Sequence, residues 1–288
     1  MIYKLWYHQY LQLYKRKIAE KTRESYTRIE TLIEPIIGEK ELEAISPDDI
    51  QAALVCVEET AGSRQAQIAF ALLHAAFNRA VRSRHLEQSP VDAIDKPHHV
   101  SQEGRVLEGK DWEILAPIVS ANVAYALMCF AGLRRGEVLA LQKADIDFKN
   151  EFIHVCKQRI RTKGKIITKT PKSEAGTRKV PIDPNLVAIL RSETRYLTPN
   201  ALIVPVAPET LNHNWTKTQK AVGIKKPYRL HDLRHTYATR LTLDGLSPRV
   251  LQYVIGHSSY TLTAKTYTHI NATSAKTEIS RIYQGKAK

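Results

Sequence analysis

Residues able to do chemistry gather in one stretch, 231–267, of this 288-residue chain. His231 and Arg234 stand three positions apart, a spacing that places both side chains on one face of a helix. His257 and Tyr267 follow, and the stretch has neither a cysteine nor a dense cluster of carboxylates. An arginine fork can bind two phosphate oxygens at once, and a tyrosine can form a covalent intermediate when its neighbours activate it. These residue types indicate a tyrosine oxygen that attacks a phosphodiester.

Arg134 follows a glycine break at Gly132 and stands at the start of a predicted helix. A turn in this place can aim the guanidinium at a bound anion, and Glu137, three residues on, can hold that guanidinium in position. An ordinary ion pair at a helix start would produce the same pattern, so Arg134 alone does not decide between the two interpretations.

Positive charge is concentrated in the second part of the chain. The protein carries a net charge of +14 and has a pI of about 9.6. Residues 1–100 contribute −1 of this charge and residues 101–288 contribute +15. A field of this sign predicts a polyanionic partner such as nucleic acid.

The densest basic run lies between residues 157 and 179, with nine basic residues and one acidic residue. Alternating patterns predict strands over 151–156, 165–170 and 179–182. Gly164 stands in the expected hairpin turn. A solvated hairpin would more often mix charges of both signs, so we expect this ribbon to contact DNA. The expected contacts are Lys157, Arg159, Arg161, Lys163 and Arg178.

Residues 1–94 are expected to form an all-helical, DNA-binding unit. Apolar positions recur at helical spacing, and Ser46-Pro47 marks one helix start as an N-cap followed by proline. Because the second half is so basic, we expect arginines on the last helix to touch phosphates as well. The expected helices are 2–18, 22–33, 46–58 and 63–85, and the expected contacts are Arg64, Arg79 and Arg82.

The segment 95–105 combines proline, glycine and polar residues without periodicity, which predicts a linker. Its adjacent His98 and His99 lack a third ligand at suitable spacing, so no metal site is expected there. A second domain, 106–288, mixes helical and strand patterns and ends in an amphipathic tail, 271–288, suited to docking on its own chain or on a neighbouring subunit. The expected helices are 107–119, 122–130, 186–195, 210–221 and 247–256, and residues 145–147 are expected to form a turn.

The cysteines and the lengths of the apolar runs indicate in which cellular compartment the protein is expected. Cys56, Cys129 and Cys156 are far apart and form no CxxC pair, so we expect reduced core residues and neither a disulfide framework nor a zinc site. No run of about 18 apolar residues and no signal peptide is visible, so no membrane partner is expected. The expected location is the cytoplasm, in association with the nucleoid.

Four segments resemble, in order, the motifs of the tyrosine recombinases of the phage-integrase family. They are GLRRGEVLAL at 132–141, PKSEAGTRKVPI at 171–182, LHDLRHTYAT at 230–239 and IGHSSYTLTAKTYTHI at 255–270. The resemblance extends to the helical half, which is similar to the family's core-binding domain. It implies a mostly α protein with a small antiparallel β-sheet (α+β), in which a helical core-binding domain is joined by a linker to a mixed α/β catalytic domain.

The resemblance implies a positively charged clamp for the scissile phosphate. Arg134 and Arg234 would bind the non-bridging oxygens on which charge develops, and His257 would donate to one of them. His235 and His269 are expected to be packing or supporting residues. Because the arginines balance the charge, neither a metal nor another cofactor is expected.

The resemblance also implies how protons move. Tyr267 would form a 3′-phosphotyrosine link with help from His231, because a phenol with a pKa of about 10 is a poor nucleophile. Lys172 would protonate the leaving 5′ oxygen as general acid. Tyr260 is the alternative nucleophile but lacks the Thr-Tyr-Thr-His context, and Lys169 is the alternative general acid. The link stores bond energy, so no ATP is needed.

The function implied is site-specific recombination, in which a mobile element of phage or conjugative-transposon origin is integrated or excised. The implied partners are double-stranded DNA attachment sites, further copies in a homotetramer that exchanges tails, and accessory DNA-bending or directionality proteins. A type IB topoisomerase, a non-catalytic DNA-binding regulator and a metal-dependent nuclease are the alternatives. Such integrases often carry an arm-binding domain before the core-binding domain. Here the first helix is expected at once, so the protein uses simple sites or lacks a natural N-terminus.

Overall fold

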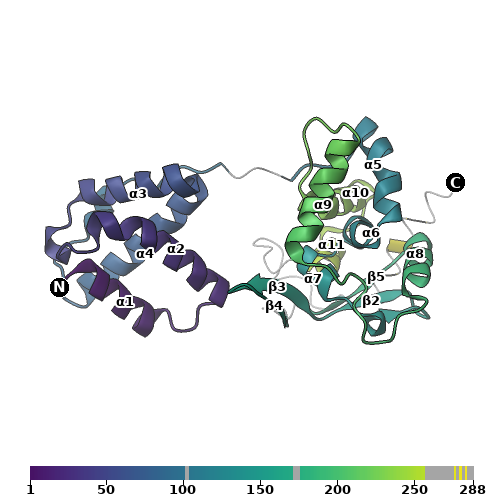
Figure 1. The fold of residues 1–288 in the computed structure, drawn as a ribbon, viewed down its shortest axis with the longest axis horizontal. Coiled ribbons are helices and arrows are strands. Elements are labelled where there is room, and N and C mark those ends of the chain that lie inside the picture. The colour runs from purple at the N-terminus through teal and green to yellow at the C-terminus, as the bar shows by residue number, and fades with distance from the viewer. Residues whose placement is uncertain (101–103, 171–175, 257–275, 277–278, 281–282, 284–288) are drawn as a thin grey trace. The chain divides into compact units, whose positions relative to one another are not determined.

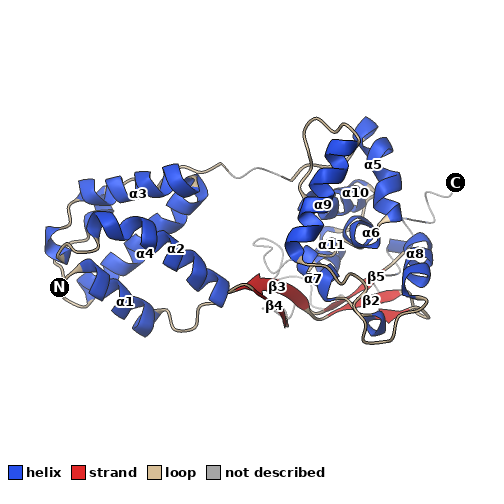
Figure 2. Ribbon diagram, in the orientation of Figure 1, coloured by secondary structure: helices blue, strands red, loops and turns tan. Residues whose placement is uncertain are grey.

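The computed structural model describes residues 1–100, 104–170, 176–256, 276, 279, 280 and 283. The chain divides into two compact units, Met1–Gln102 and Glu103–Lys288 (Figure 1). The first is helical, whereas the second mixes helices with two small antiparallel sheets (Figure 2). The expected fold class, mostly α with a small antiparallel sheet, is confirmed.

The first unit packs four α-helices around one apolar core. Tyr3 of the first helix stacks on Phe77 of the last one, with ring centroids 5.7 Å apart, and Trp6 and Tyr7 are buried in the same core. The indole of Trp6 also donates to the carbonyl of Ala76 at 3.1 Å, which satisfies its buried N–H. The helices are α1 (Tyr3–Tyr14), α2 (Glu20–Ile37), α3 (Pro47–Ala61) and α4 (Ser63–Arg82), with short 3-10 turns at Leu42–Ala44 and Pro90–Ala93.

The start of α3 confirms the capping pattern expected at Ser46. Its hydroxyl accepts a hydrogen bond from the backbone N–H of Asp49 at 3.2 Å, and the Asp49 carboxylate accepts one from the Ser46 N–H at 3.0 Å. The second helix is longer than expected, because it continues through Pro35 to Ile37. A proline in the last turn costs one backbone hydrogen bond, which packing of the buried Ile33 and Ile37 offsets.

The second unit has its helical core around α6 (Val123–Phe130) and α10 (Leu230–Leu243), whose apolar residues are buried together. In Figure 2 the three-stranded sheet lies along one side of these helices. Across the part of the chain that the structure describes, no single helix is long and apolar enough to cross a membrane, and α5 with α6 meets those criteria only as a pair bent by 120°. The remaining helices are α5 (Gly109–Ala121), α7 (Arg135–Ala140), α8 (Pro184–Thr194), α9 (Pro208–Ala221) and α11 (Pro248–Ile255), with a 3-10 turn at Lys143–Asp145.

The strands depart from the sequence prediction in their pairing. The expected turn at 145–147 contains a short strand, β1 (Ile146–Asp147), which pairs with β2 (Phe152–Val155). The hairpin around Gly164 is formed by β3 (Gln158–Thr162) and β4 (Lys165–Lys169), whereas β2 pairs with β5 (Arg178–Pro181). The strand β3 was not predicted, because its single Ile160 among polar residues produces no apolar alternation.

The described tail residues pack against the second unit of the same chain. Ile279 is buried in its core, and Tyr283 packs against that core. Lys276 donates to the carbonyl of Asn150 and forms an ion pair with Glu151 at 3.2 Å. The described part of the tail therefore docks in cis in this structure.

Candidate functional site

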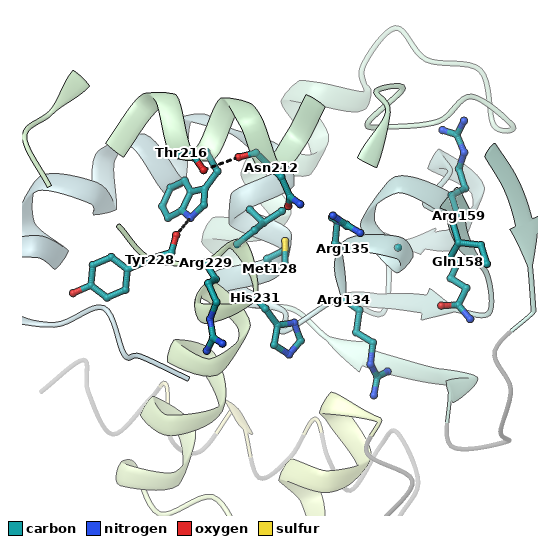
Figure 3. A pocket seen from close by; sticks show the side chains of 14 residues that line it. Met128, Arg134, Arg135, Gln158, Arg159, Asn212, Thr216, Tyr228, Arg229 and His231 are labelled. Carbon is teal, nitrogen blue, oxygen red and sulfur yellow. Dashed lines mark hydrogen bonds between the residues drawn. The ribbon is translucent and has the colours of Figure 1, made fainter. Parts of the chain in front are cut away.

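A cavity of about 590 Å³ opens between α7, β3, α9 and α10 of the second unit (Figure 3). Its lining combines an apolar wall with four arginines and a histidine. The apolar wall includes Met128, Ile160, Trp215 and Leu230, and the basic residues are Arg134, Arg135, Arg159, Arg229 and His231. The positive charge of this lining suits a polyanionic ligand that binds at the surface of the second unit.

The N-terminus of α10 places His231 and Arg234. Asp232 is buried and accepts hydrogen bonds from the Arg229 backbone N–H at 2.8 Å and the Arg229 guanidinium at 3.0 Å. These bonds close the first turn of the helix. His231 then lies at the cavity, while Arg234, one turn later, is buried with a side chain that is 3% exposed. The spacing predicted from sequence thus puts the two side chains on one helical face.

A glycine turn places Arg134 beside α10. Gly132 has φ +62°, a conformation that glycine adopts readily, and Arg134 follows in extended conformation immediately before α7. The carbonyl of Gly132 accepts a hydrogen bond from the Arg234 guanidinium. Arg134 and Arg234 therefore approach each other because the turn between α6 and α7 runs against α10.

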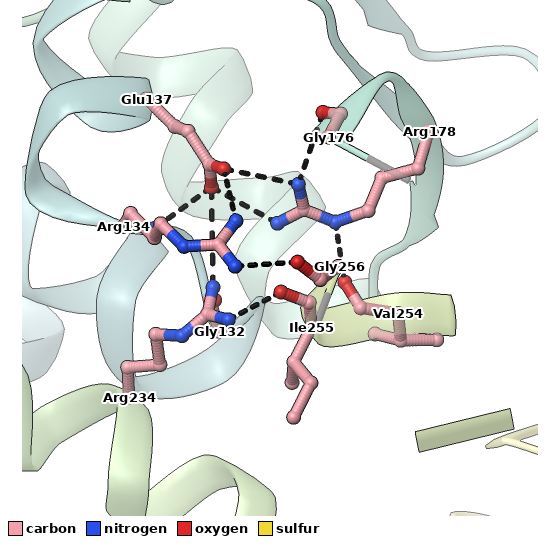
Figure 4. A network of polar contacts seen from close by, with 9 residues as sticks. All are labelled: Gly132, Arg134, Glu137, Gly176, Arg178, Arg234, Val254, Ile255 and Gly256. Atoms are coloured by element: carbon pink, nitrogen blue, oxygen red, sulfur yellow. Dashed lines mark hydrogen bonds and ion pairs between the residues drawn. The ribbon is translucent and has the colours of Figure 1, made fainter. Parts of the chain in front are cut away.

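One buried carboxylate, that of Glu137, organises three arginines (Figure 4). Its oxygens accept from Arg134 Nη1 at 2.8 Å and from the Arg134 backbone N–H at 2.8 Å. They also accept from Arg178 Nη1 at 3.0 Å and Nη2 at 2.9 Å, a bidentate pair. Arg234 Nη1 lies 3.9 Å from Glu137 Oε2. Three guanidiniums thus share one negative charge, which leaves an excess of positive charge.

Three consecutive carbonyls at the end of α11 accept from the same three arginines. Val254 accepts from Arg178 Nε at 2.6 Å, Ile255 accepts from Arg234, and Gly256 accepts from Arg134. Carbonyls at a helix C-terminus have no partner within the helix and carry the negative end of its dipole, so guanidiniums suit them. Gly256 itself takes the left-handed C-cap conformation.

The surroundings shift the pKa values of this network. Burial would raise the pKa of Glu137, but the hydrogen bonds and charges of Arg178 and Arg134 hold it below its ordinary value. Burial and the neighbouring Arg134 lower the pKa of Arg234 to about 9. Partial loss of solvent around its ring, with the charges of Arg234 and Arg134, lowers the pKa of His231. At neutral pH the carboxylate is therefore ionised and His231 is neutral.

The expected catalytic residues fall into two groups. Arg134, His231 and Arg234 come together at or beneath the wall of the cavity. The other three, Lys172, His257 and Tyr267, lie outside the described residues, as do the alternative nucleophile Tyr260 and His269. Lys169, the alternative general acid, is on β4, and His235 lies so close to Gly104 that a Cβ there would be 2.7 Å from its ring.

The residues expected to contact DNA are at least partly exposed on the two units, with the exception of Arg178. Arg64 lines a second cavity, of about 370 Å³, in the first unit, and Arg79 stacks 4.0 Å from the ring centre of Tyr14. Arg82 and Lys163 are exposed. The exception is Arg178, whose side chain is 1% exposed and bound to Glu137, so its expected surface contact with DNA is corrected to a buried structural bond.

Three expected contacts on the ribbon also have partners within the protein. Lys157 forms an ion pair with Asp145 at 3.1 Å, and Arg161 forms one with Glu209 at 3.0 Å. Arg159 lines the first cavity and donates to the carbonyl of Leu139 at 3.3 Å. These bonds hold the three cations in place along β3 and just before it.

Sequence reasoning missed Arg135 and Arg229 as members of the cavity. Arg135 directly follows Arg134, and Arg229 stands two positions before His231. Both arginines are therefore close in sequence to residues that the motifs identify. The sequence predicts Glu137 only as support for Arg134 and gives no sign of its bonds to Arg178. Within the described ranges, no three His, Cys, Asp or Glu side chains converge as a metal-binding group.

Comparison with known proteins assigns the chain to a family. The family model described as Phage integrase family matches residues 116–274, which is more than half of the chain. The chain belongs to the phage integrase family of tyrosine recombinases. A second model, Phage integrase, N-terminal SAM-like domain, matches residues 3–54 of this integrase-family protein. The resemblance found in the motifs is therefore confirmed.

Two curated relatives show the extent of the likeness. A tyrosine recombinase XerC-like protein from Caldanaerobacter subterraneus subsp. tengcongensis is 29% identical over 178 residues, covering 51% of this chain and 45% of that protein. The transposase of transposon Tn916 from Enterococcus faecalis is 24% identical over 283 residues, covering 87% of this chain and 69% of that protein. The aligned part of the integrase-family chain thus spans less than half of the first relative.

Solved structures share the fold of this integrase-family protein. A fragment of the Tn1549 transposon integrase in complex with transposon right end DNA has a TM-score of 0.77 at 21% identity, covering 98% of this chain and 100% of that one. A lambda integrase dimer bound to a COC' core site has a TM-score of 0.66 at 20% identity, covering 94% and 100%. At these identities the likeness establishes the fold.

Proposed function

We propose that this protein is a site-specific DNA recombinase that cleaves and rejoins DNA through a 3′-phosphotyrosine link formed by Tyr267. One observation carries the proposal: Arg134 and Arg234 converge beside a basic cavity, and Glu137 balances only part of their charge and that of Arg178. A dianionic transition state at phosphorus would supply the missing negative charge. Membership of the phage integrase family supports the same reaction.

The two arginines are suited to hold the scissile phosphate. Arg134 has a side chain that is 34% exposed, so its guanidinium can meet a ligand from solvent while Glu137 fixes its orientation. Arg234 is fixed more tightly by the carbonyls of Gly132 and Ile255. Each guanidinium has five N–H groups and donates two of them to described residues, so the other three are suited to phosphate oxygens.

Proton transfer follows from the charges around His231. Its lowered pKa leaves the ring neutral at neutral pH, so one ring nitrogen can accept the phenolic proton as Tyr267 attacks phosphorus. The bond between phosphorus and the 5′ oxygen breaks, and Lys172 gives that oxygen a proton. Rejoining is the reverse: a 5′ hydroxyl attacks phosphorus and loses its proton to Lys172, while the tyrosine oxygen leaves and regains its proton from His231. His257 donates to a non-bridging oxygen in both directions.

The DNA duplex would lie on basic surfaces of both units. In the second unit these are the cavity residues Arg135, Arg159 and Arg229 and the β3–β4 hairpin, whose cations suit phosphate contacts. In the first unit Arg64 and Arg82 are exposed on α4. Solved lambda integrase structures contain a dimer on a core site and a tetramer on a Holliday junction. We extend these assemblies to this protein as a homotetramer on attachment sites in the nucleoid, with exchanged tails and with accessory DNA-bending or directionality proteins.

The decisive experiment uses nicked duplex DNA that spans the candidate ends of the mobile element. The nick releases a short fragment after cleavage, which traps the covalent protein–DNA adduct. We expect the wild type to form an adduct that survives denaturation and chelator, and Tyr267→Phe to form none. A nicked duplex of scrambled sequence is the control for site specificity.

Other outcomes would identify the alternatives. An adduct on any sequence, with relaxation of supercoils and no strand exchange between two duplexes, would indicate a type IB topoisomerase. Cleavage that stops with chelator would indicate a metal-dependent nuclease. Tight binding to the ends with no adduct from the wild type would indicate a non-catalytic regulator and would overturn the proposal.

A further inference from the structure

Arg178 has no part in the proposed reaction, yet it makes four hydrogen bonds in the buried network (Figure 4). Its Nε donates to Val254 at 2.6 Å, and Nη1 donates to Gly176 at 3.4 Å. Nη1 and Nη2 donate to the two oxygens of Glu137 at 3.0 and 2.9 Å. Each nitrogen is thus engaged with protein, and the side chain is 1% exposed, so Arg178 does not reach a phosphate.

Arg178 and its partners come from three separate segments of the chain. Arg178 itself begins β5 and stands six residues after Lys172 in the sequence. Glu137 lies on α7 and holds Arg134, whereas Val254 lies in the last turn of α11, three residues before His257. One planar side chain therefore spans the segments that carry a clamp arginine and two other expected catalytic groups.

A second contact joins the same strand and helix. The backbone N–H of Lys179 donates to the hydroxyl of Tyr253 at 3.5 Å. Beside it, the carbonyls of Val254, Ile255 and Gly256 are held by Arg178, Arg234 and Arg134 in that order. If the hydrogen bond from Arg178 to Val254 were lost, the end of α11 would shift. The carbonyls of Ile255 and Gly256 would then no longer be aligned with Arg234 and Arg134.

We infer that Arg178 is a positioning residue for the proposed recombination: it fixes the end of α11 and the carboxylate of Glu137 relative to each other. Arg134 is then oriented by Glu137 and by the carbonyl of Gly256. Lysine would keep the charge, but its single nitrogen cannot make a bidentate bond to a carboxylate and reach a carbonyl on the far side. The inference rests on the proposed function only for the catalytic readout.

The test compares Arg178→Lys with the wild type on the nicked duplex under single turnover. We expect adduct formation to slow by about 10- to 100-fold, because a shift of about 1 Å in reacting groups can cost that much. The affinity for DNA and its dependence on salt should stay unchanged, because Arg178 does not touch phosphates. Arg195→Lys, the same substitution at an exposed position just after α8, should react at the wild-type rate.

A double substitution separates positioning from an independent catalytic role. If Arg178 acts through Glu137, the pair Arg178→Lys with Glu137→Gln should react no more slowly than the slower single variant. The inference would be overturned if the rate losses of the two single variants multiplied in the double variant. It would also be overturned if Arg178→Lys formed the adduct at the wild-type rate, or if its affinity for DNA depended less on salt. Arg178→Gln, which is neutral and still donates one hydrogen bond, takes its place if the lysine variant does not fold.

Native-state hydrogen exchange provides a readout that does not need catalysis. The amides of the last turn of α11 should exchange at least tenfold faster in Arg178→Lys, while those of α9 stay unchanged. Equal exchange in α11 would overturn the positioning role even if adduct formation were slow. Absence of any adduct from the wild type would reject the proposed function alone and leave the exchange result to decide the role of Arg178.

Discussion

Gly132 and Tyr237 lie in direct backbone-to-ring contact. A Cβ built on Gly132 would stand 2.5 Å from Cδ1 and 2.8 Å from Cε1 of the Tyr237 ring, distances that atoms in proteins do not adopt. The glycine also has φ +62°, and its carbonyl accepts from Arg234. One residue thus allows α10 to approach the turn that delivers Arg134.

Gly132→Ala should therefore destabilise the second unit. We expect a loss of about 1 to 3 kcal/mol from the left-handed backbone and a further loss from the displaced Tyr237 ring. Gly164→Ala is the matched control, because Gly164 also has positive φ, +73°, with nothing near its added Cβ. Calorimetric unfolding should show a lower melting temperature for the Gly132 variant than for the Gly164 variant, and equal values would contradict the close contact.

Glu137→Gln should destabilise the second unit by about 3 to 5 kcal/mol at neutral pH, because it leaves buried arginines without their counter-charge. The exposed Glu193→Gln is the control and should stay within about 0.5 kcal/mol of the wild type. Urea unfolding of the three proteins at neutral pH measures these free energies.

Glu137 should also make the free energy of unfolding depend on pH. The folded-state pKa of Glu137 is lower than its unfolded value, so its ionised form binds protons less readily in the folded protein. Its contribution is complete above the unfolded pKa of about 4.3 and is lost as pH falls through the folded value. The wild type should lose free energy of unfolding over this window relative to Glu137→Gln. Parallel curves for the two proteins would show that Glu137 does not titrate in this way.

His231 should titrate below the ordinary histidine pKa of about 6.5, which proton NMR of its ring can follow. Arg134→Gln removes one of the charges that lower this value, so the pKa of His231 should rise in that variant. Arg191→Gln removes a charge on α8, outside the cavity, and should leave the titration in place. No change in the Arg134 variant would mean that the two side chains do not interact electrostatically.

Arg159→Gln should weaken DNA binding by the same factor on specific and scrambled duplexes. Loss of one phosphate contact should reduce the slope of log affinity against log salt by about 0.9. Fluorescence anisotropy at several salt concentrations measures both effects. Arg191→Gln, which removes the same charge away from the cavity, should leave the slope as it is, and a slope unchanged by Arg159→Gln would remove that residue from the interface.

Local interactions explain which features could be predicted from sequence. The cap of α3 at Ser46 depends on residues within one turn, and the apolar run 122–130 identifies a buried helix by composition alone. The spacing of His231 and Arg234 likewise fixes a shared helical face once the helix is present. The family motifs and the charge difference between the halves are properties of residue order, so the sequence alone determines both.

Strand pairing and burial required the tertiary structure. Arg178 stands in a basic run and resembled a surface residue, but β5 pairs with β2 so that Arg178 lies opposite the buried Val155. Side chains alternate between the two faces of a strand, so Arg178 and Val180 point to the core and Lys179 to solvent. Sequence fixes that alternation but not which face is buried, because the burial of a face depends on helices far along the chain. Only their packing brings Glu137 and the end of α11 to meet the buried arginine.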